Sequence, residues 1–111
     1  MTNPIIDQST FNELSDTAGT DFVRELVATF LEEAPGMLAE LRAALEARSA
    51  ERFRRAAHSL KSNGLTFGAN TLAAMARDLE LGGLPADAAG LAAIAQEYAR
   101  VAAALQELCN G

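Results

Sequence analysis

Apolar residues recur along most of this 111-residue chain at the three- and four-residue spacing that places them on one face of a helix. The pattern predicts helices over about residues 8–16, from Thr20 or Asp21 to 45, from Ser49 to 65 or 67, from 72 to Gly82, and from Pro85 or Asp87 to 108. Four long amphipathic helices with short connections predict an all-α, antiparallel four-helix bundle, with the short N-terminal helix capping one end.

Residues with strong preferences for helix ends support these boundaries. Thr10 and Glu13 have the spacing of a capping box. Ser49 is a typical N-cap residue, and Gly68 provides a turn. Pro35 interrupts the second pattern without ending it, so a kink or a short break is expected there.

Composition narrows the class of protein. Half of the residues are hydrophobic and the net charge is −6, which disfavours binding to nucleic acids or to anionic membranes. No apolar run approaches the roughly 20 residues of a membrane span, and residues 1–7 do not resemble a secretory signal. Cys109 is the single cysteine, so an internal disulfide is excluded. We expect one cytoplasmic domain over residues 1–111, with the bundle at about 8–109.

The third predicted helix carries the most informative residues. On a helical wheel, its apolar and small residues form one core face: Phe53, Ala56, Ala57, Leu60, Gly64 and Phe67. His58 lies about 140° from the centre of that face, so the single histidine of the chain is expected to be exposed. Gly64 lies on the core face, where the absence of a side chain permits close packing against another helix.

The neighbours of His58 on this helix suit an anion. Lys61 and Ser62 lie three and four residues further on, which places them on the next turn beside the imidazole. The lysine is suited to pair with an anion on the ring, and the small serine leaves the ring accessible. Positive charge is concentrated here, because four of the nine Lys and Arg residues are Arg52, Arg54, Arg55 and Lys61. Leu65 is an apolar residue on the exposed side.

A neutral, exposed imidazole is a competent nucleophile toward an activated phosphate. A lone histidine on a helix is nevertheless most often an ordinary surface residue, and clustered arginines commonly form a solvated face. The periodicity alone leaves both interpretations open.

The segment from Ala57 to Ala69, AHSLKSNGLTFGA, resembles the active-site signature of histidine phosphotransfer (HPt) domains. In that family a His is followed by a variable residue, a Leu, a Lys and small residues, with a Gly-Ala turn about ten residues on. The preceding segment 21–35 and the following segment 72–80 also resemble the family's helices. The resemblance covers about residues 5–108, and the Met1 start favours a free-standing member.

The resemblance implies that His58 accepts a phosphoryl group from an aspartate of a receiver domain and passes it to another receiver. Lys61 would neutralise the phosphoryl group, and Ser62 stands where many members have Gly. Arg54, Arg55 and Leu65 are the candidates for docking partners, which would be receiver domains of response regulators or hybrid histidine kinases. The expected protein is a monomeric phosphocarrier of two-component signalling, with no metal or cofactor of its own and no ATP-dependent kinase activity, and Mg²⁺ is expected only on the receiver.

Three other interpretations compete with this one. A dimerisation and phosphoacceptor domain of a sensor kinase would place an acidic residue directly after the His and a Pro nearby, and Ser59 and Ser62 do not fit. A helical adaptor would bind receiver or kinase domains without being phosphorylated. A conventional enzyme would need a second titratable partner in a cleft, and we interpret Asp78 and Glu80 as solvated residues of the fourth helix.

Overall fold

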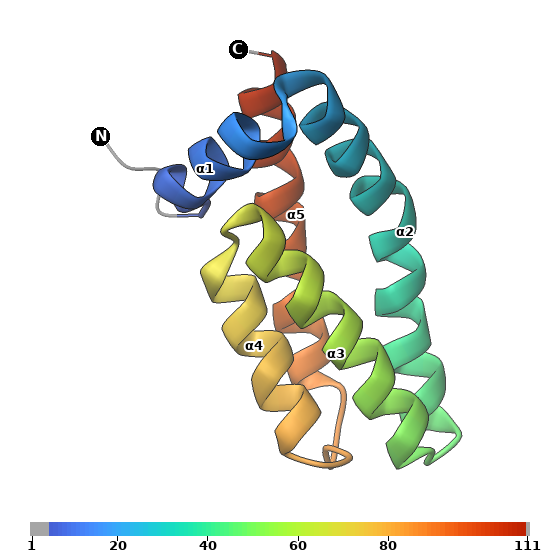
Figure 1. Cartoon of the computed structure of the whole chain (residues 1–111). Helices are drawn as coiled ribbons and strands as arrows, with labels where there is room; N and C mark the ends of the chain where they lie inside the picture. Colours follow the sequence, from blue (N-terminus) through green and yellow to red (C-terminus); the bar gives the residue numbers. More distant parts are fainter. Residues whose placement is uncertain (1–4, 111) are drawn as a thin grey trace.

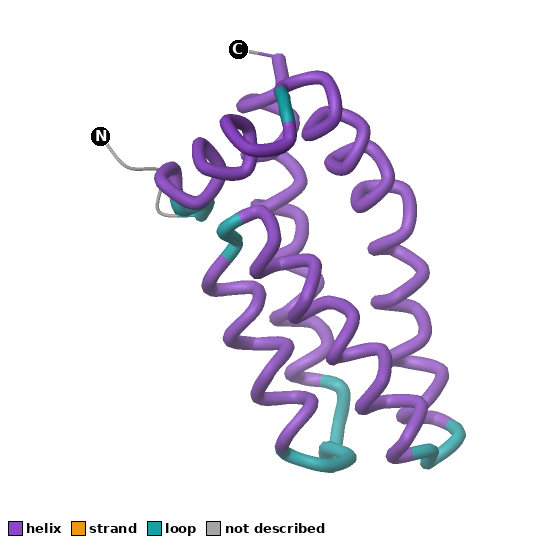
Figure 2. Tube along the Cα trace, viewed as in Figure 1, coloured by secondary structure: helices purple, strands orange, loops and turns teal. Residues whose placement is uncertain are grey.

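The computed structural model describes residues 5–110, and within them the chain forms five helices and no strand. Residues 1–4 and Gly111 lie outside the described residues. Figures 1 and 2 show the later helices lying lengthwise, while the first helix crosses one end of the molecule. The helices are α1 (Gln8–Ala18), α2 (Thr20–Glu46), α3 (Ala50–Phe67), α4 (Asn70–Leu81) and α5 (Ala89–Asn110).

The boundaries of α3 are those that the sequence predicts. The Ser49 hydroxyl accepts a hydrogen bond from the Arg52 N–H and so satisfies one of the free donors of the first turn. At the other end, Gly68 adopts a left-handed conformation with a φ of 77°, which a glycine adopts without steric cost. Its N–H donates to the carbonyl groups of Gly64 and Leu65.

The predicted starts of α1 and α2 are confirmed at Gln8 and Thr20, but the predicted capping residues are wrong. Asp7 rather than Thr10 is the N-cap residue of α1, and the Thr10 hydroxyl instead donates to the Asp7 carboxylate at 2.7 Å. Gly19 rather than Thr20 or Asp21 is the N-cap residue of α2, and its φ of 92° lets the chain turn sharply between α1 and α2 in a single residue.

Helix α2 continues through Pro35, so the predicted short break is absent. A proline has no N–H to donate to the carbonyl four residues earlier, which here belongs to Leu31. The Tyr98 hydroxyl of α5 lies 3.4 Å from that carbonyl oxygen and donates to it. A side chain from another helix thus partly replaces the backbone hydrogen bond that Pro35 removes.

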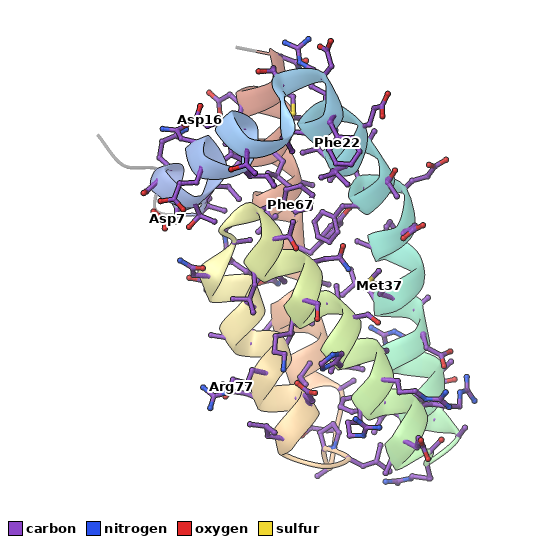
Figure 3. All side chains as sticks on the ribbon, viewed as in Figure 1. Asp7, Asp16, Phe22, Met37, Phe67 and Arg77 are labelled. Atoms are coloured by element: carbon purple, nitrogen blue, oxygen red, sulfur yellow. The ribbon has the colours of Figure 1, made fainter. Side chains whose placement is uncertain are left out.

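The core lies between the lengthwise helices and is built from aliphatic residues and three phenylalanines of α2 and α3. The ring of Phe30 packs 5.4 Å from that of Phe67 and 5.8 Å from that of Tyr98, and Figure 3 shows Phe67 at the end of α3 that faces α1. The largest fully buried side chains are Phe30, Phe53, Phe67, Ile6, Leu41, Leu60, Leu72, Ile94, Leu105, Val23 and Val101.

The N-terminal end of the described chain packs on the turn between α3 and α4. Ile6 is fully buried, and the Asp7 N–H donates to the Gly68 carbonyl at 2.8 Å. A side chain at Gly68 would come within 2.9 Å of the Asp7 carbonyl oxygen. This end of the α3–α4 hairpin is therefore held in place from outside. No helix within residues 5–110 combines the length and the apolar character needed to cross a bilayer.

Candidate functional site

The site begins with the two faces of α3. All six residues of the predicted core face are buried, so the helix is fixed in rotation about its axis. This orientation places His58 on the outside with 55% of its side chain exposed, as the helical wheel predicts. The single histidine is therefore accessible to another molecule.

The imidazole of His58 is held by a carboxylate from the neighbouring helix. Its Nδ1 atom lies 2.7 Å from Oε2 of Glu80, near the end of α4. The other oxygen of that carboxylate, Oε1, lies 2.6 Å from Nζ of Lys61. Glu80 thus bridges two side chains of α3 that are one turn apart, although its own side chain is only 10% exposed.

The charge of Glu80 determines which ring nitrogen of His58 carries the proton. Contact with the Lys61 ammonium, and secondly with His58, holds the pKa of Glu80 below its ordinary value. The carboxylate is therefore ionised at neutral pH and acts only as an acceptor. The hydrogen bond at 2.7 Å then requires a proton on Nδ1, and in the neutral ring this leaves the lone pair on Nε2. The arrangement leaves the Nε2 lone pair available for reaction.

Our interpretation of Glu80 as a solvated helix residue is wrong. Along α4 alone it follows Asp78 and precedes exposed Leu81, so its own helix gives no sign of a specific role. Its shielding comes from α3, which packs closely beside the end of α4. From the sequence we find no second titratable group beside His58. In the structure Glu80 of α4 is that group.

Lys61 and Ser62 occupy the next turn of α3, as predicted. Lys61 is drawn toward α4 by its ion pair with Glu80, and only 24% of its side chain is exposed. Ser62 is exposed on the same side, and its carbonyl accepts a hydrogen bond from the Thr66 hydroxyl at 3.0 Å. Lys61 is therefore joined to His58 through its ion pair with Glu80, and Ser62 leaves the surface beside them open.

The three candidate docking residues all reach the surface of α3. Arg54 and Arg55 are exposed one turn before His58, and Arg54 makes only a 4.0 Å contact with exposed Glu51. Leu65 is 53% exposed two turns after His58. It borders a shallow apolar groove between α3 and α4 that Arg77 also lines, and Figure 3 shows Arg77 projecting outward from α4. The structure thus places charged and apolar candidates on opposite sides of the histidine.

Helices α2 and α3 are separated by a wider, polar groove of about 500 Å³. Arg52 bridges this side by donating two hydrogen bonds of 2.9 Å to the Glu40 carboxylate. Among residues 5–110, no group of three or more His, Cys, Asp or Glu side chains is arranged to hold a metal ion.

Comparison with known proteins gives one match. The model of a family described as the Hpt domain matches residues 25–104, which is more than half of the chain and includes all of α3 and α4. No curated protein and no solved structure matches the chain.

Proposed function

The chain belongs to the Hpt domain family, and from this premise we propose that His58 accepts a phosphoryl group from a receiver-domain aspartate and passes it to an aspartate of another receiver. Domains of this family are histidine phosphotransfer modules of phosphorelays that interact with receiver domains. The observation that carries the proposal for this chain is the exposed imidazole whose Nδ1–H is bound by Glu80.

The proposed transfer is an in-line displacement at phosphorus. The Nε2 lone pair of His58 forms the N–P bond while the P–O bond to the receiver aspartate breaks, and the bonding electrons leave with the aspartate carboxylate. The ring then keeps its proton on Nδ1 and carries a positive charge, which the adjacent Glu80 carboxylate stabilises. Transfer to the second receiver reverses these bond changes.

Lys61 has two anionic partners in this scheme. In the unphosphorylated protein its ammonium pairs with Glu80. In the phosphorylated protein the phosphoryl oxygens on the adjacent turn compete for the same ammonium, so we propose that Lys61 neutralises part of their charge. Ser62 keeps the space beside the phosphoryl group open.

We further propose that the chain works as a monomeric phosphocarrier with no ATP-dependent kinase activity. The fold for this role is one antiparallel four-helix bundle capped by α1. The Mg²⁺ ion belongs to the receiver. Arg54, Arg55 and Leu65 contact the receiver around His58, because they are the exposed cationic and apolar residues nearest to it along α3.

A phosphotransfer assay tests this proposal. The purified chain is incubated with receiver domains that carry labelled phosphate on aspartate, beside a His58→Gln variant. We expect acid-labile, alkali-stable label on the wild type and none on the variant. If no receiver transfers label and both proteins bind receivers equally well, the chain is a helical adaptor and the proposal is wrong.

A further inference from the structure

Helices α3 and α4 approach each other closely at one glycine. Gly64 is buried, and a Cβ atom added to it would lie 3.3 Å from three atoms: the Ala69 carbonyl oxygen, the Ala73 Cβ and the Ala73 nitrogen. Two of these are backbone atoms, which cannot move aside by a change of rotamer. A side chain at position 64 therefore requires α4 and its preceding turn to give way by a few tenths of an ångström.

The same two helices carry the site. His58 precedes Gly64 by six residues on α3, and Glu80 follows Ala73 by seven on α4. At 1.5 Å per residue these separations are about 9 Å and about 10.5 Å. The close contact and the pair formed by His58 and Glu80 are thus two points along one interface, about two helical turns apart.

The hairpin is held at its turn, and its other end leads into the connection to α5. The turn is held by the hydrogen bond from Ala69 N–H to the Gly64 carbonyl and by the Asp7 segment that packs on Gly68. Beyond Glu80, α4 ends at Gly82. A wedge at Gly64 is therefore expected to separate the helices most at the Glu80 end.

The contacts of Glu80 tolerate little separation. Its distances are 2.7 Å to His58 Nδ1 and 2.6 Å to Lys61 Nζ, and a hydrogen bond weakens beyond about 3.2 Å. A displacement on the order of 0.5–1 Å is enough to lose the hydrogen bond.

We propose that Gly64 is a positioning residue for His58: the absence of a side chain lets α4 come close enough for Glu80 to bind the Nδ1–H and leave Nε2 as the nucleophile. The consequence for phosphotransfer rests on the function proposed above. The geometric part does not, because the tautomer of His58 is a property of the unphosphorylated protein.

The test uses ¹⁵N NMR of the His58 ring in alkaline solution, which reports which ring nitrogen carries the proton. We expect the wild type to hold the proton on Nδ1. Gly64→Ala should shift the ring toward a mixture of tautomers and slow phosphotransfer by up to about tenfold, the effect expected from loss of the Glu80 contact. Gly90→Ala is the matched control, because a Cβ there meets only Leu79 Cδ2 at an ordinary 3.5 Å. It should change neither result.

Two further variants separate positioning from general damage. Gly64→Ala combined with Ala73→Gly removes one of the three close contacts and should recover part of the Nδ1–H population. If Gly64→Ala does not fold, Ala73→Ser replaces it in the test. It adds one oxygen atom beside the same contact and should also shift the ring toward a mixture of tautomers.

The outcomes distinguish this inference from the proposed function. A folded Gly64→Ala protein with an unchanged tautomer would overturn the role of Gly64 even if the wild type accepts phosphate. A shifted tautomer in a chain that no receiver phosphorylates would support the positioning role while rejecting the phosphotransfer function.

Discussion

Helix α3 packs against α4 on one side and α2 on the other, and a carboxylate crosses each interface. On the α4 side, Glu80 reaches His58 and Lys61, and its side chain is only 10% exposed. On the α2 side, Glu40 binds Arg52 with two hydrogen bonds, but both side chains are about 40% exposed beside an open groove. The two contacts are similar in length and differ in their surroundings.

This difference in surroundings explains why Glu80, and not Glu40, is suited to orient a reactive side chain. An exposed ion pair is screened by water and salt and competes with the mobility of its side chains. Glu80 is shielded by the close packing of α3 and α4 and has two partners, so its carboxylate is fixed in position. Glu40 and Glu80 both carry a charge, so charge alone does not fix a carboxylate in position. The close approach of α3 and α4 is what allows Glu80 to orient His58.

The largest difference between the two interfaces is expected in phosphotransfer. Glu80→Gln removes the charge that binds the Nδ1–H and that stabilises the charged ring, so transfer to His58 should slow by roughly tenfold, in line with groups that orient a reactive imidazole. Glu40→Gln is the matched control on the other side of α3 and should stay within about twofold of the wild type. Rapid-quench kinetics with one charged receiver measures both, and equal rates in the two variants would contradict the comparison.

A second prediction compares the stability effect of a glycine-to-alanine substitution at the α2 side of α3 with that of the same substitution at the α4 side. Gly36 lies inside α2, where a Cβ atom would meet nothing within 4 Å. Gly36→Ala should therefore stabilise the protein by up to about 1 kcal/mol through helix propensity alone. Gly64→Ala should gain less or lose stability, because the new Cβ lies 3.3 Å from α4 and its turn. Urea denaturation measures both, and an equal gain in the two variants would mean that the α3–α4 contact is not tight.

The smallest effect is expected in the pH dependence of stability. The pKa of Glu80 is held below its ordinary value of 4.5, first by Lys61 and then by His58. The folded protein therefore binds this proton more weakly than the unfolded chain, so the stabilisation is present above pH 4.5 and is lost as the pH falls through the folded-state pKa. Urea midpoints of wild type and Glu80→Gln should differ at about pH 6, and the difference should shrink as the pH falls from 4.5 through the folded-state pKa of Glu80.

The other carboxylate supplies the control for this titration. Arg52 also lowers the pKa of Glu40, so Glu40→Gln should show the same sign. Its difference from the wild type should be smaller and should shrink with added salt, because the pair is exposed. A wild-type advantage over Glu80→Gln that persists unchanged into acid would show that the charge of Glu80 does not stabilise the fold.

Much of the fold could be predicted because local chemistry determines it. The apolar spacing located the helices, and Ser49 and Gly68 marked the ends of α3 correctly. The exposure of His58 could be predicted because the core face of α3 is clear from its sequence and His58 lies on the opposite side. At Pro35 the sequence predicts a kink or a short break, and the break is absent. The carbonyl that Pro35 leaves without its backbone donor accepts a hydrogen bond from Tyr98 of α5, a partner that the local sequence does not show.

The role of Glu80 could not be read from its own helix because it depends on how α3 and α4 pack. A signal was nevertheless present in the sequence. His58 and Glu80 lie the same number of residues before and after Ala69, so a tight turn at that point places them opposite each other. Gly64 indicated a close approach of helices but not which helix would approach.

The central claim is that Glu80 occupies Nδ1 and leaves Nε2 of His58 to take the phosphoryl group. The most direct test is to phosphorylate the chain from a charged receiver and to identify the phosphorylated nitrogen by ¹H–³¹P correlation NMR in alkaline solution. The account predicts phosphate on Nε2 of His58. Phosphate on Nδ1, or on any other residue, would contradict it.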